Sequence, residues 1–109
     1  MIDLVAAQAV SLAHDPVPAE QVVAGEPSTG SVALGTLADA EYGVWEMTPG
    51  AMSDVEEDEL FVVLFGVATV AFADGAFWTL GPGSTGRLDA GSRTVWTVTE
   101  TLRKVYVTG

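Results

Sequence analysis

Cysteine is absent from the sequence, and basic residues are scarce. Without cysteine the chain has no disulfide framework, no thiolate nucleophile and no cysteine-type zinc site. Four basic residues against fifteen acidic ones give a net charge of −11. A surface this negative repels phosphate backbones and anionic lipid, so we expect no nucleic-acid partner and no membrane partner.

Long hydrophobic runs are also missing. No stretch approaches the roughly 20 apolar residues of a membrane-spanning helix. The first fifteen residues contain Asp3 but no lysine or arginine, whereas a secretory signal begins with basic residues. We therefore expect a cytoplasmic protein.

What the sequence does contain is the pattern of an all-β domain. Its 109 residues suffice for one domain, and 49% of them are hydrophobic. Valine- and threonine-rich runs alternate with glycine- and proline-containing turns at intervals of roughly 8–12 residues, which is typical of a sandwich or barrel. Eight short strands favour a jelly roll. The predicted strands cover residues 32–37, 41–47, 60–65, 68–73, 76–80, 84–88, 93–99 and 102–107.

The N-terminal region has a different composition. Residues 15–30 carry three prolines and two glycines, which predicts an extended arm. Before it, the apolar residues between Val5 and Val10 permit one or two helical turns. We divide the chain into an arm, residues 1–21, and a domain, residues 22–109. The apolar run 4–12 would be exposed on a single subunit, so we expect the arm to lie at a homodimer interface.

Two motifs resemble those of small single-domain cupins. The first comprises residues 43–50 (GVWEMTPG), 58–60 (DEL) and Gly66; the second comprises residues 81–83 (GPG), 90–91 (AG), 94–96 (TVW) and 103–107 (RKVYV). The resemblance is to the subfamily that includes ureidoglycine aminohydrolase and the ethanolamine-utilisation cupin, and it extends from residue 22 to the end. It implies a cupin barrel, also called a double-stranded β-helix, in a family with many members of unassigned function.

The resemblance also implies a metal site, but this sequence lacks most of the ligands. Cupin motifs normally supply three histidines and one glutamate, a donor set that suits Mn, Fe, Ni or Zn. Here Glu59 falls on the glutamate position and Thr94 on the histidine position of the second motif. The remaining histidine positions fall on Met52 and Asp54, or on the residue after each of them. We therefore expect no transition metal and no other cofactor.

Glu59 is the candidate catalytic residue. If its side chain faces the barrel interior, it is placed for general acid–base catalysis. The alternative is a structural carboxylate that pairs with Lys104 or Arg103. The acidic residues before it, 54–58 (DVEED), lack the spacing of a calcium loop, and we interpret them as a solvated loop.

Aromatic residues supply the candidate ligand pocket. By alternation, Thr94 and Trp96 share one strand face, while Glu59 shares another with Phe61, Val63 and Phe65. If both faces line the lumen, it is an apolar pocket with Glu59 and Thr94 as its polar groups. Alternatively, side chains fill so small a barrel completely. The pocket candidates are Trp45, Asp54, Phe61, Thr94, Trp96 and Lys104.

Only one of the adjacent residues Arg103 and Lys104 can point inward, because neighbouring strand residues face opposite sides. An inward cation would attract a ligand carboxylate or phosphate. The alternative is that one of them pairs with Glu59 or Glu100 while the other is solvated. His14 lies outside both motifs, and we expect it to be solvated unless a dimer places it over a neighbouring barrel.

Three functions fit these features. The one that we favour is binding of a small metabolite in the lumen, without a transition metal and without turnover. The second is an enzyme of hydrolase or isomerase type that uses Glu59 as acid–base catalyst. The third is a degenerate cupin that serves as a dimeric interaction or structural protein.

Overall fold

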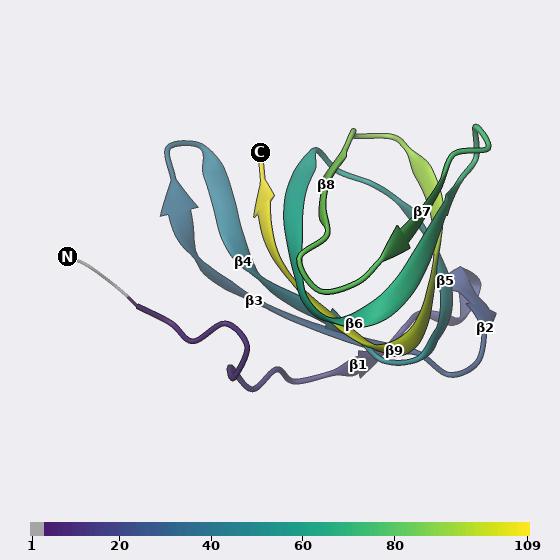
Figure 1. The fold of residues 1–109 in the computed structure, drawn as a ribbon, viewed down its shortest axis with the longest axis horizontal. Coiled ribbons are helices and arrows are strands. Elements are labelled where there is room, and N and C mark those ends of the chain that lie inside the picture. The colour runs from purple at the N-terminus through teal and green to yellow at the C-terminus, as the bar shows by residue number, and fades with distance from the viewer. Residues whose placement is uncertain (1–3) are drawn as a thin grey trace.

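The computed structural model describes residues 4–109, and strands dominate this part of the chain (Figure 1). It forms nine antiparallel strands and one short 3-10 helix. No helix in it is long and apolar enough to cross a membrane. The elements are β1 (Asp15–Pro16), η1 (Ala19–Gln21), β2 (Val22–Ala24), β3 (Ser28–Leu37), β4 (Ala40–Met47), β5 (Gly50–Val55), β6 (Glu59–Phe72), β7 (Phe77–Leu80), β8 (Thr85–Leu88) and β9 (Arg93–Thr108).

Two long strands, β6 and β9, form the spine of the sheet. β9 pairs with β5 and β4 along one edge and with β6 along the other. The strand order is β1-β3-β4-β9-β5-β2, and β6 also pairs with β7 and β8. The sheet curls around its own concave face, as Figure 1 shows. The all-β jelly-roll barrel predicted from the sequence is confirmed.

Several predicted strand boundaries are wrong in the same way. The separate strands predicted at 60–65 and 68–73 are one strand, β6, and those at 93–99 and 102–107 are one strand, β9. Irregular register between β6 and β9 lets both strands bend without ending. Of the one or two helical turns expected between Val5 and Val10, a single turn forms at residues 7–9, where the amides of Ala9 and Val10 donate to the carbonyl oxygen of Ala6.

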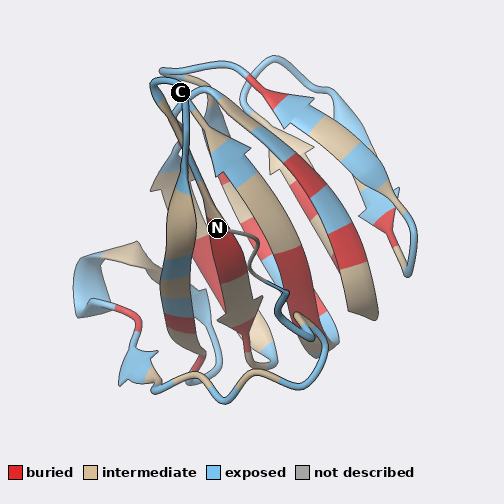
Figure 2. Cartoon of the chain, turned by 90° about the vertical axis from the view of Figure 1, so that its left-hand side faces the viewer, coloured by how far each residue is buried: buried red, intermediate tan, exposed pale blue. Residues whose placement is uncertain are grey.

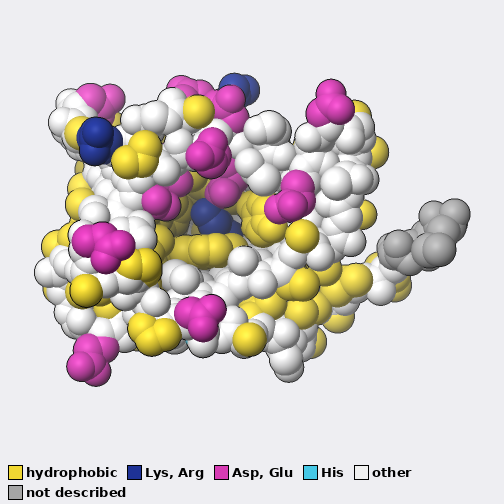
Figure 3. All heavy atoms as spheres, turned by 180° about the vertical axis from the view of Figure 1, so that it is seen from behind, with side chains coloured by type: hydrophobic (Ala, Val, Ile, Leu, Met, Phe, Trp, Pro, Cys, Tyr) yellow, Lys and Arg dark blue, Asp and Glu magenta, His cyan; other side chains and the backbone are white. Residues whose placement is uncertain are grey.

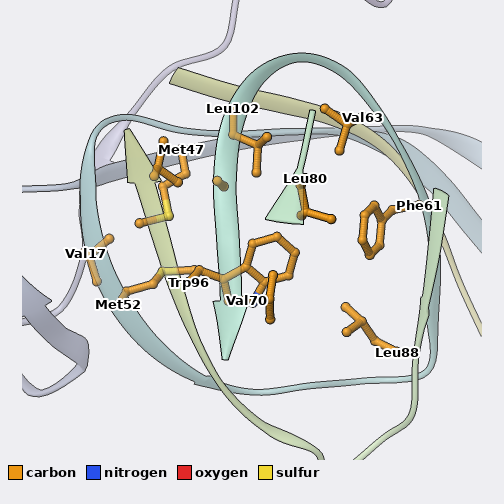
Figure 4. Packing of buried hydrophobic residues seen from close by; sticks show 12 residues of the cluster. Val17, Met47, Met52, Phe61, Val63, Val70, Leu80, Leu88, Trp96 and Leu102 are labelled. Carbon is orange, nitrogen blue, oxygen red and sulfur yellow. The ribbon is translucent and has the colours of Figure 1, made fainter. Parts of the chain in front are cut away.

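The hydrophobic core lies inside the curled sheet. Side chains from β4 to β9 converge there, with Met47, Phe61, Trp96 and Leu102 among the least exposed (Figure 4). Buried and exposed residues alternate along the strands because successive side chains point to opposite faces (Figure 2). Each large side chain buried in this way stabilises the fold by about 1.5–3 kcal/mol.

The N-terminal arm is attached to the outer face of the sheet through Arg103. The Nη1 group of Arg103 donates hydrogen bonds to the carbonyl oxygens of Ala7 and Val10 at 3.0 and 2.6 Å. Its Nε donates to Glu46 at 3.0 Å, and the other oxygen of Glu46 lies 2.6 Å from Nε2 of His14. The expectations of a solvated His14 and a solvated second cation are therefore wrong, because His14 contacts Glu46 and Ser28 and the arm covers Arg103.

Phe65 also lies on this outer face. Its ring centroid is 5.4 Å from the Arg103 guanidinium. The sequence pattern placed it with Glu59, Phe61 and Val63, but the register shifts between Val63 and Phe65. The extra residue at this bulge turns Phe65 to the opposite side.

Candidate functional site

A cavity of about 140 Å³ opens from the barrel interior. In the space-filling view a basic side chain lies deep in a hollow, and acidic side chains surround the opening (Figure 3). The lumen is therefore neither completely filled nor the apolar pocket expected from the sequence. Its apolar lining is Trp45, Met52 and Trp96; its polar lining is Ser31, Asp54, Glu56, Glu59, Lys104 and Tyr106.

An ion pair between Lys104 and Glu59 lies in this cavity. The Lys104 ammonium donates to Oε2 of Glu59 at 2.6 Å, and Lys104 is only 5% exposed. The same ammonium lies 4.6 Å from the ring centroids of Trp45 and Trp96 and 4.9 Å from that of Phe61. The carboxylate and three aromatic rings replace the water that a buried ammonium loses.

Strand alternation explains why Lys104 and not Arg103 enters the lumen. The even-numbered residues Trp96 and Lys104 of β9 line the cavity, whereas Arg103 contacts the arm on the other face. β9 pairs with β4 and with β6 at this level, so Lys104 lies between Trp45 and Val63 in the sheet. The sequence prediction that only one of the two cations points inward is thus confirmed.

Glu56 is the functional candidate that the sequence pattern missed. Its Oε2 accepts hydrogen bonds from Thr94 Oγ1 at 2.5 Å and from the Trp96 indole at 2.9 Å. Glu56 is 8% exposed, so its interpretation as part of a solvated loop is wrong, although Glu57 and Asp58 are exposed as expected. One signal in the sequence pointed to it, since an inward Trp96 requires a hydrogen-bond acceptor for its indole nitrogen.

Asp54 stands on β5 directly across from Thr94. Burial raises the pKa of Asp54, and the negative charge of Glu56 raises it further. The hydrogen bond from the Val55 amide and the positive charge of Lys104 oppose this rise. The ionised form of Asp54 is therefore disfavoured in the cavity.

Tyr106 lines the cavity from the end of β9. Burial raises its pKa to about 12, with a further contribution from the hydrogen bond that its hydroxyl donates to Glu41 at 3.0 Å. The phenol is therefore neutral at physiological pH and can donate or accept a hydrogen bond.

The structure brings the residues predicted from the sequence together. Trp45, Asp54, Glu59, Trp96 and Lys104 line the cavity. The other two candidates support it from behind: the Phe61 ring contacts the Lys104 ammonium, and the Thr94 hydroxyl holds Glu56.

The residues in the cavity do not fit the transition-metal site that the cupin motifs imply. Met52 and Asp54 are both cavity residues, which selects them over Ser53 and Val55 as the counterparts of the two histidines. A thioether, a carboxylate and the Thr94 hydroxyl form a poor donor set for such a metal. Moreover, the carboxylate of Glu59 is engaged by the Lys104 ammonium. Within residues 4–109 no cluster of three or more histidine, aspartate or glutamate side chains is arranged to hold a metal ion.

Other, larger hollows of the molecule do not bring several buried charged groups together. The widest, about 1050 Å³, runs along residues 16–28 and is lined mainly by proline, valine, alanine and glycine. Another, about 410 Å³, shares Asp54 with the lumen and follows the edges of β5, β6 and β9 beside the exposed Arg93. The lumen is the better candidate despite its small size, because buried charged groups meet there.

A jelly-roll barrel whose two sequence motifs deliver polar side chains to its lumen is the architecture of a cupin. A family model described as EutQ-like cupin domain matches residues 34–106, so the chain belongs to the EutQ-like cupin family. A comparison with curated proteins found no match.

Solved structures share the fold. A protein of unknown function of the DUF861 family from Pseudomonas syringae pv. tomato has 24% identity and a TM-score of 0.79, over 94% of this chain and 46% of that one. The chain thus spans about half the length of the Pseudomonas protein. The EutQ protein of Clostridium difficile has 23% identity and a TM-score of 0.66, over 75% of this chain and 68% of that one. Ectoine synthase from P. lautus has 15% identity and a TM-score of 0.65, over 85% and 67%.

Proposed function

We propose that this protein binds a small polar metabolite in the barrel lumen without the help of a transition metal. The observation that carries the proposal is the buried Lys104–Glu59 pair in an open cavity of about 140 Å³. A barrel kept only for its shape gains nothing from a buried ion pair, because apolar side chains of similar volume stabilise a core at least as well. Charged groups retained next to an open cavity are typical of a recognition site.

Native mass spectrometry of the purified protein tests this function. We expect an additional mass on the folded chain that disappears on denaturation and that is not a metal. The variant Ser31→Phe places a ring at the cavity lining and should abolish the additional mass. Thr79→Phe adds the same ring at an exposed position on β7 and should retain it.

The nuclear magnetic resonance signals of the indole N–H groups provide a second readout. The Trp96 indole lies in the cavity wall, whereas Trp78 is outside that lining and serves as an internal reference. A low-molecular-mass cell extract should shift the Trp96 signal and leave that of Trp78 in place. If no additional mass is found and no extract shifts Trp96, the proposed function is wrong.

Acid–base catalysis by Glu59 is the second candidate function. In its favour, Glu59 faces an open cavity and not a solid core, and it has a proton-carrying partner at 2.6 Å. The substitution Glu59→Gln separates the two functions. A reaction of the bound metabolite that Glu59→Gln eliminates while the metabolite still binds would favour the enzyme.

We also propose that the protein is a homodimer whose arm, residues 1–21, contributes to the interface. Support comes from the apolar side chains that the described part of the arm exposes, with Leu4 at 97% and Val5 at 43% exposure. A cytoplasmic location stays a prediction from the sequence.

A further inference from the structure

The charges in the lumen do not balance. Asp54, Glu56 and Glu59 contribute three carboxylates, whereas Lys104 is the one cation in the lining. Lys104 is paired with Glu59 at 2.6 Å, so it neutralises that carboxylate first. Asp54 and Glu56 remain without a cationic partner among the described residues.

Glu56 has one carboxylate oxygen, Oε1, that is available as a hydrogen-bond acceptor. Thr94 and Trp96 both donate to its Oε2, which fixes the orientation of the carboxylate. No described residue donates to its other oxygen, Oε1. No buried side-chain oxygen of the described residues lacks a partner, so Oε1 is accessible to solvent. Because the Glu56 side chain lines the cavity, a donor group of a ligand can reach this oxygen.

The aromatic wall of the cavity holds a cation of the chain itself. Trp45 and Trp96 already hold the Lys104 ammonium at 4.6 Å from their ring centroids. Indole faces attract cations because of the negative charge of the ring face. The Lys104 ammonium occupies these faces and repels a second cation, so the attraction for a ligand ammonium comes from the carboxylates of Asp54 and Glu56, which repel an anion.

We propose that the metabolite bound in the lumen is a small organic cation whose ammonium group is recognised by Asp54 and Glu56. This inference rests on the proposed function, since it identifies the ligand class of the same cavity. At about 140 Å³ the cavity holds only a few heavy atoms, given that a water molecule occupies about 30 Å³ in the liquid. A primary amine of three or four carbons, or a compact amidine, fits these limits.

The raised pKa of Asp54 agrees with this ligand class. Burial and the charge of Glu56 make the ionised form of Asp54 unfavourable in the empty cavity. A cationic ligand opposes both effects, so binding of the cation should release protons near the pH at which Asp54 titrates.

Three probes with a three-carbon chain test the inference: propylammonium, propan-1-ol and propionate. We expect propylammonium to shift the Trp96 indole signal in a saturable manner, with an affinity at least tenfold higher than either other probe. The Trp78 signal should stay in place. Sodium, magnesium and calcium chloride at matched ionic strength should not reproduce the shift.

Glu56→Gln and Asp54→Asn should each weaken propylammonium binding at least tenfold, because each removes one negative charge. Glu57→Gln is the matched control, since Glu57 is an exposed neighbour of Glu56. It should bind propylammonium as the wild type does. An unchanged Trp78 signal in each variant shows that the barrel is folded.

The outcomes distinguish the two proposals. If propan-1-ol or propionate shifts Trp96 as strongly as propylammonium, the lumen binds ligands but the cation inference is wrong. If the metal chlorides alone saturate the shift, the site is one for inorganic cations and the inference is again wrong. If no probe shifts Trp96 and native mass spectrometry finds no bound metabolite, the proposed function fails together with the inference.

Discussion

At the scale of single residues, Lys104 determines the character of the lumen. Its ammonium lies where three aromatic rings and Glu59 converge, and it is almost completely buried. A buried ammonium depends on its partner, because each charge of the pair has lost most of its solvent. The contribution of the pair can therefore be measured by removing one charge or both.

Lys104→Met should destabilise the protein by roughly 3 kcal/mol at pH 7, because Glu59 is left charged and unpaired in the cavity. The double variant Glu59→Gln/Lys104→Met should recover to within about 1 kcal/mol of the wild type. Urea unfolding measures both. Arg87→Met is the control, since the Arg87–Asp89 pair is largely exposed and its loss should change the stability by less than about 0.5 kcal/mol. A single variant as stable as the double one would contradict this role of the pair.

The raised pKa of Asp54 predicts a specific dependence of stability on pH. The folded protein binds the Asp54 proton more tightly than the unfolded chain, whose ordinary pKa is 3.8. The free energy of unfolding therefore loses this contribution as pH rises from 3.8 through the raised folded pKa. Asp54→Asn does not titrate, so its stability relative to the wild type should increase between pH 4 and pH 7. A series of urea unfolding curves across this pH range measures the difference.

The sequence predicted the position of single residues correctly where alternation along a strand determines which face of the sheet a side chain lies on. Trp96 and Lys104 point inward and Arg103 outward for that reason. Glu56 was missed because it lies between strands, where no alternation applies, and because its acidic neighbours are typical of a solvated loop. The two hydrogen bonds that bury it come from β9, far away in sequence.

At the scale of elements, one glycine explains why two predicted strands are a single strand. Gly66 lies between residues 60–65 and 68–73, which were predicted as separate strands, but in the structure it lies within β6 with φ of +98°. A Cβ at this position would lie 2.1 Å from the carbonyl oxygen of Thr101. Glycine therefore permits both the bend of β6 and its close contact with β9.

Gly66→Ala should destabilise the barrel by about 3 kcal/mol or more, because the new methyl group overlaps the backbone of β9. Gly75→Ala is the matched control, since Gly75 has a similar φ of +95° but nothing within 4 Å of an added Cβ. It should cost about 1 kcal/mol, from the backbone conformation alone. Thermal and urea unfolding of the two variants compare the effects. Equal losses would show that the contact with Thr101 is unimportant.

Three strands had no adequate signal in the sequence. β1 and β2 lie in the proline-containing segment 15–30, and β1 includes Pro16 itself. β5 has the sequence GAMSDV, with one β-branched residue and no clear alternation of polar and apolar side chains. It is nevertheless a strand because β9 and β2 pair with it on both sides. Such pairing is tertiary information that short-range patterns do not contain.

At the scale of the whole molecule, the arm connects the barrel to the proposed second subunit. Within one chain its first part, residues 4–12, is attached by the backbone carbonyls of Ala7 and Val10, to which Arg103 donates, and its later part by His14, β1 and the buried Val17. Arg103 keeps its ion pair with Glu46 when the arm is removed, so the barrel should remain folded.

Deletion of residues 1–14 should therefore convert a dimer to a monomer and leave the circular dichroism spectrum of the barrel unchanged. The reason is that the deletion removes the exposed apolar side chains of the arm, including Leu4 and Val5. Sedimentation equilibrium of both proteins at several concentrations measures the subunit number. A dimer that persists after the deletion would place the interface elsewhere, and a monomeric full-length chain would refute the proposed dimer itself.

The opposite facing of Arg103 and Lys104 also bears on the accuracy of strand alignment during folding. A slip of β9 by one residue would turn each of its side chains to the other face of the sheet. The guanidinium would then enter the lumen, and the ammonium would lie beneath the arm, far from Glu59 and the aromatic rings. Two misplaced buried charges, together with the outward turn of the buried side chains Trp96 and Val98, make that alternative barrel unfavourable. The two neighbouring cations therefore favour the native alignment of β9, because only this alignment gives both Arg103 and Lys104 their partners.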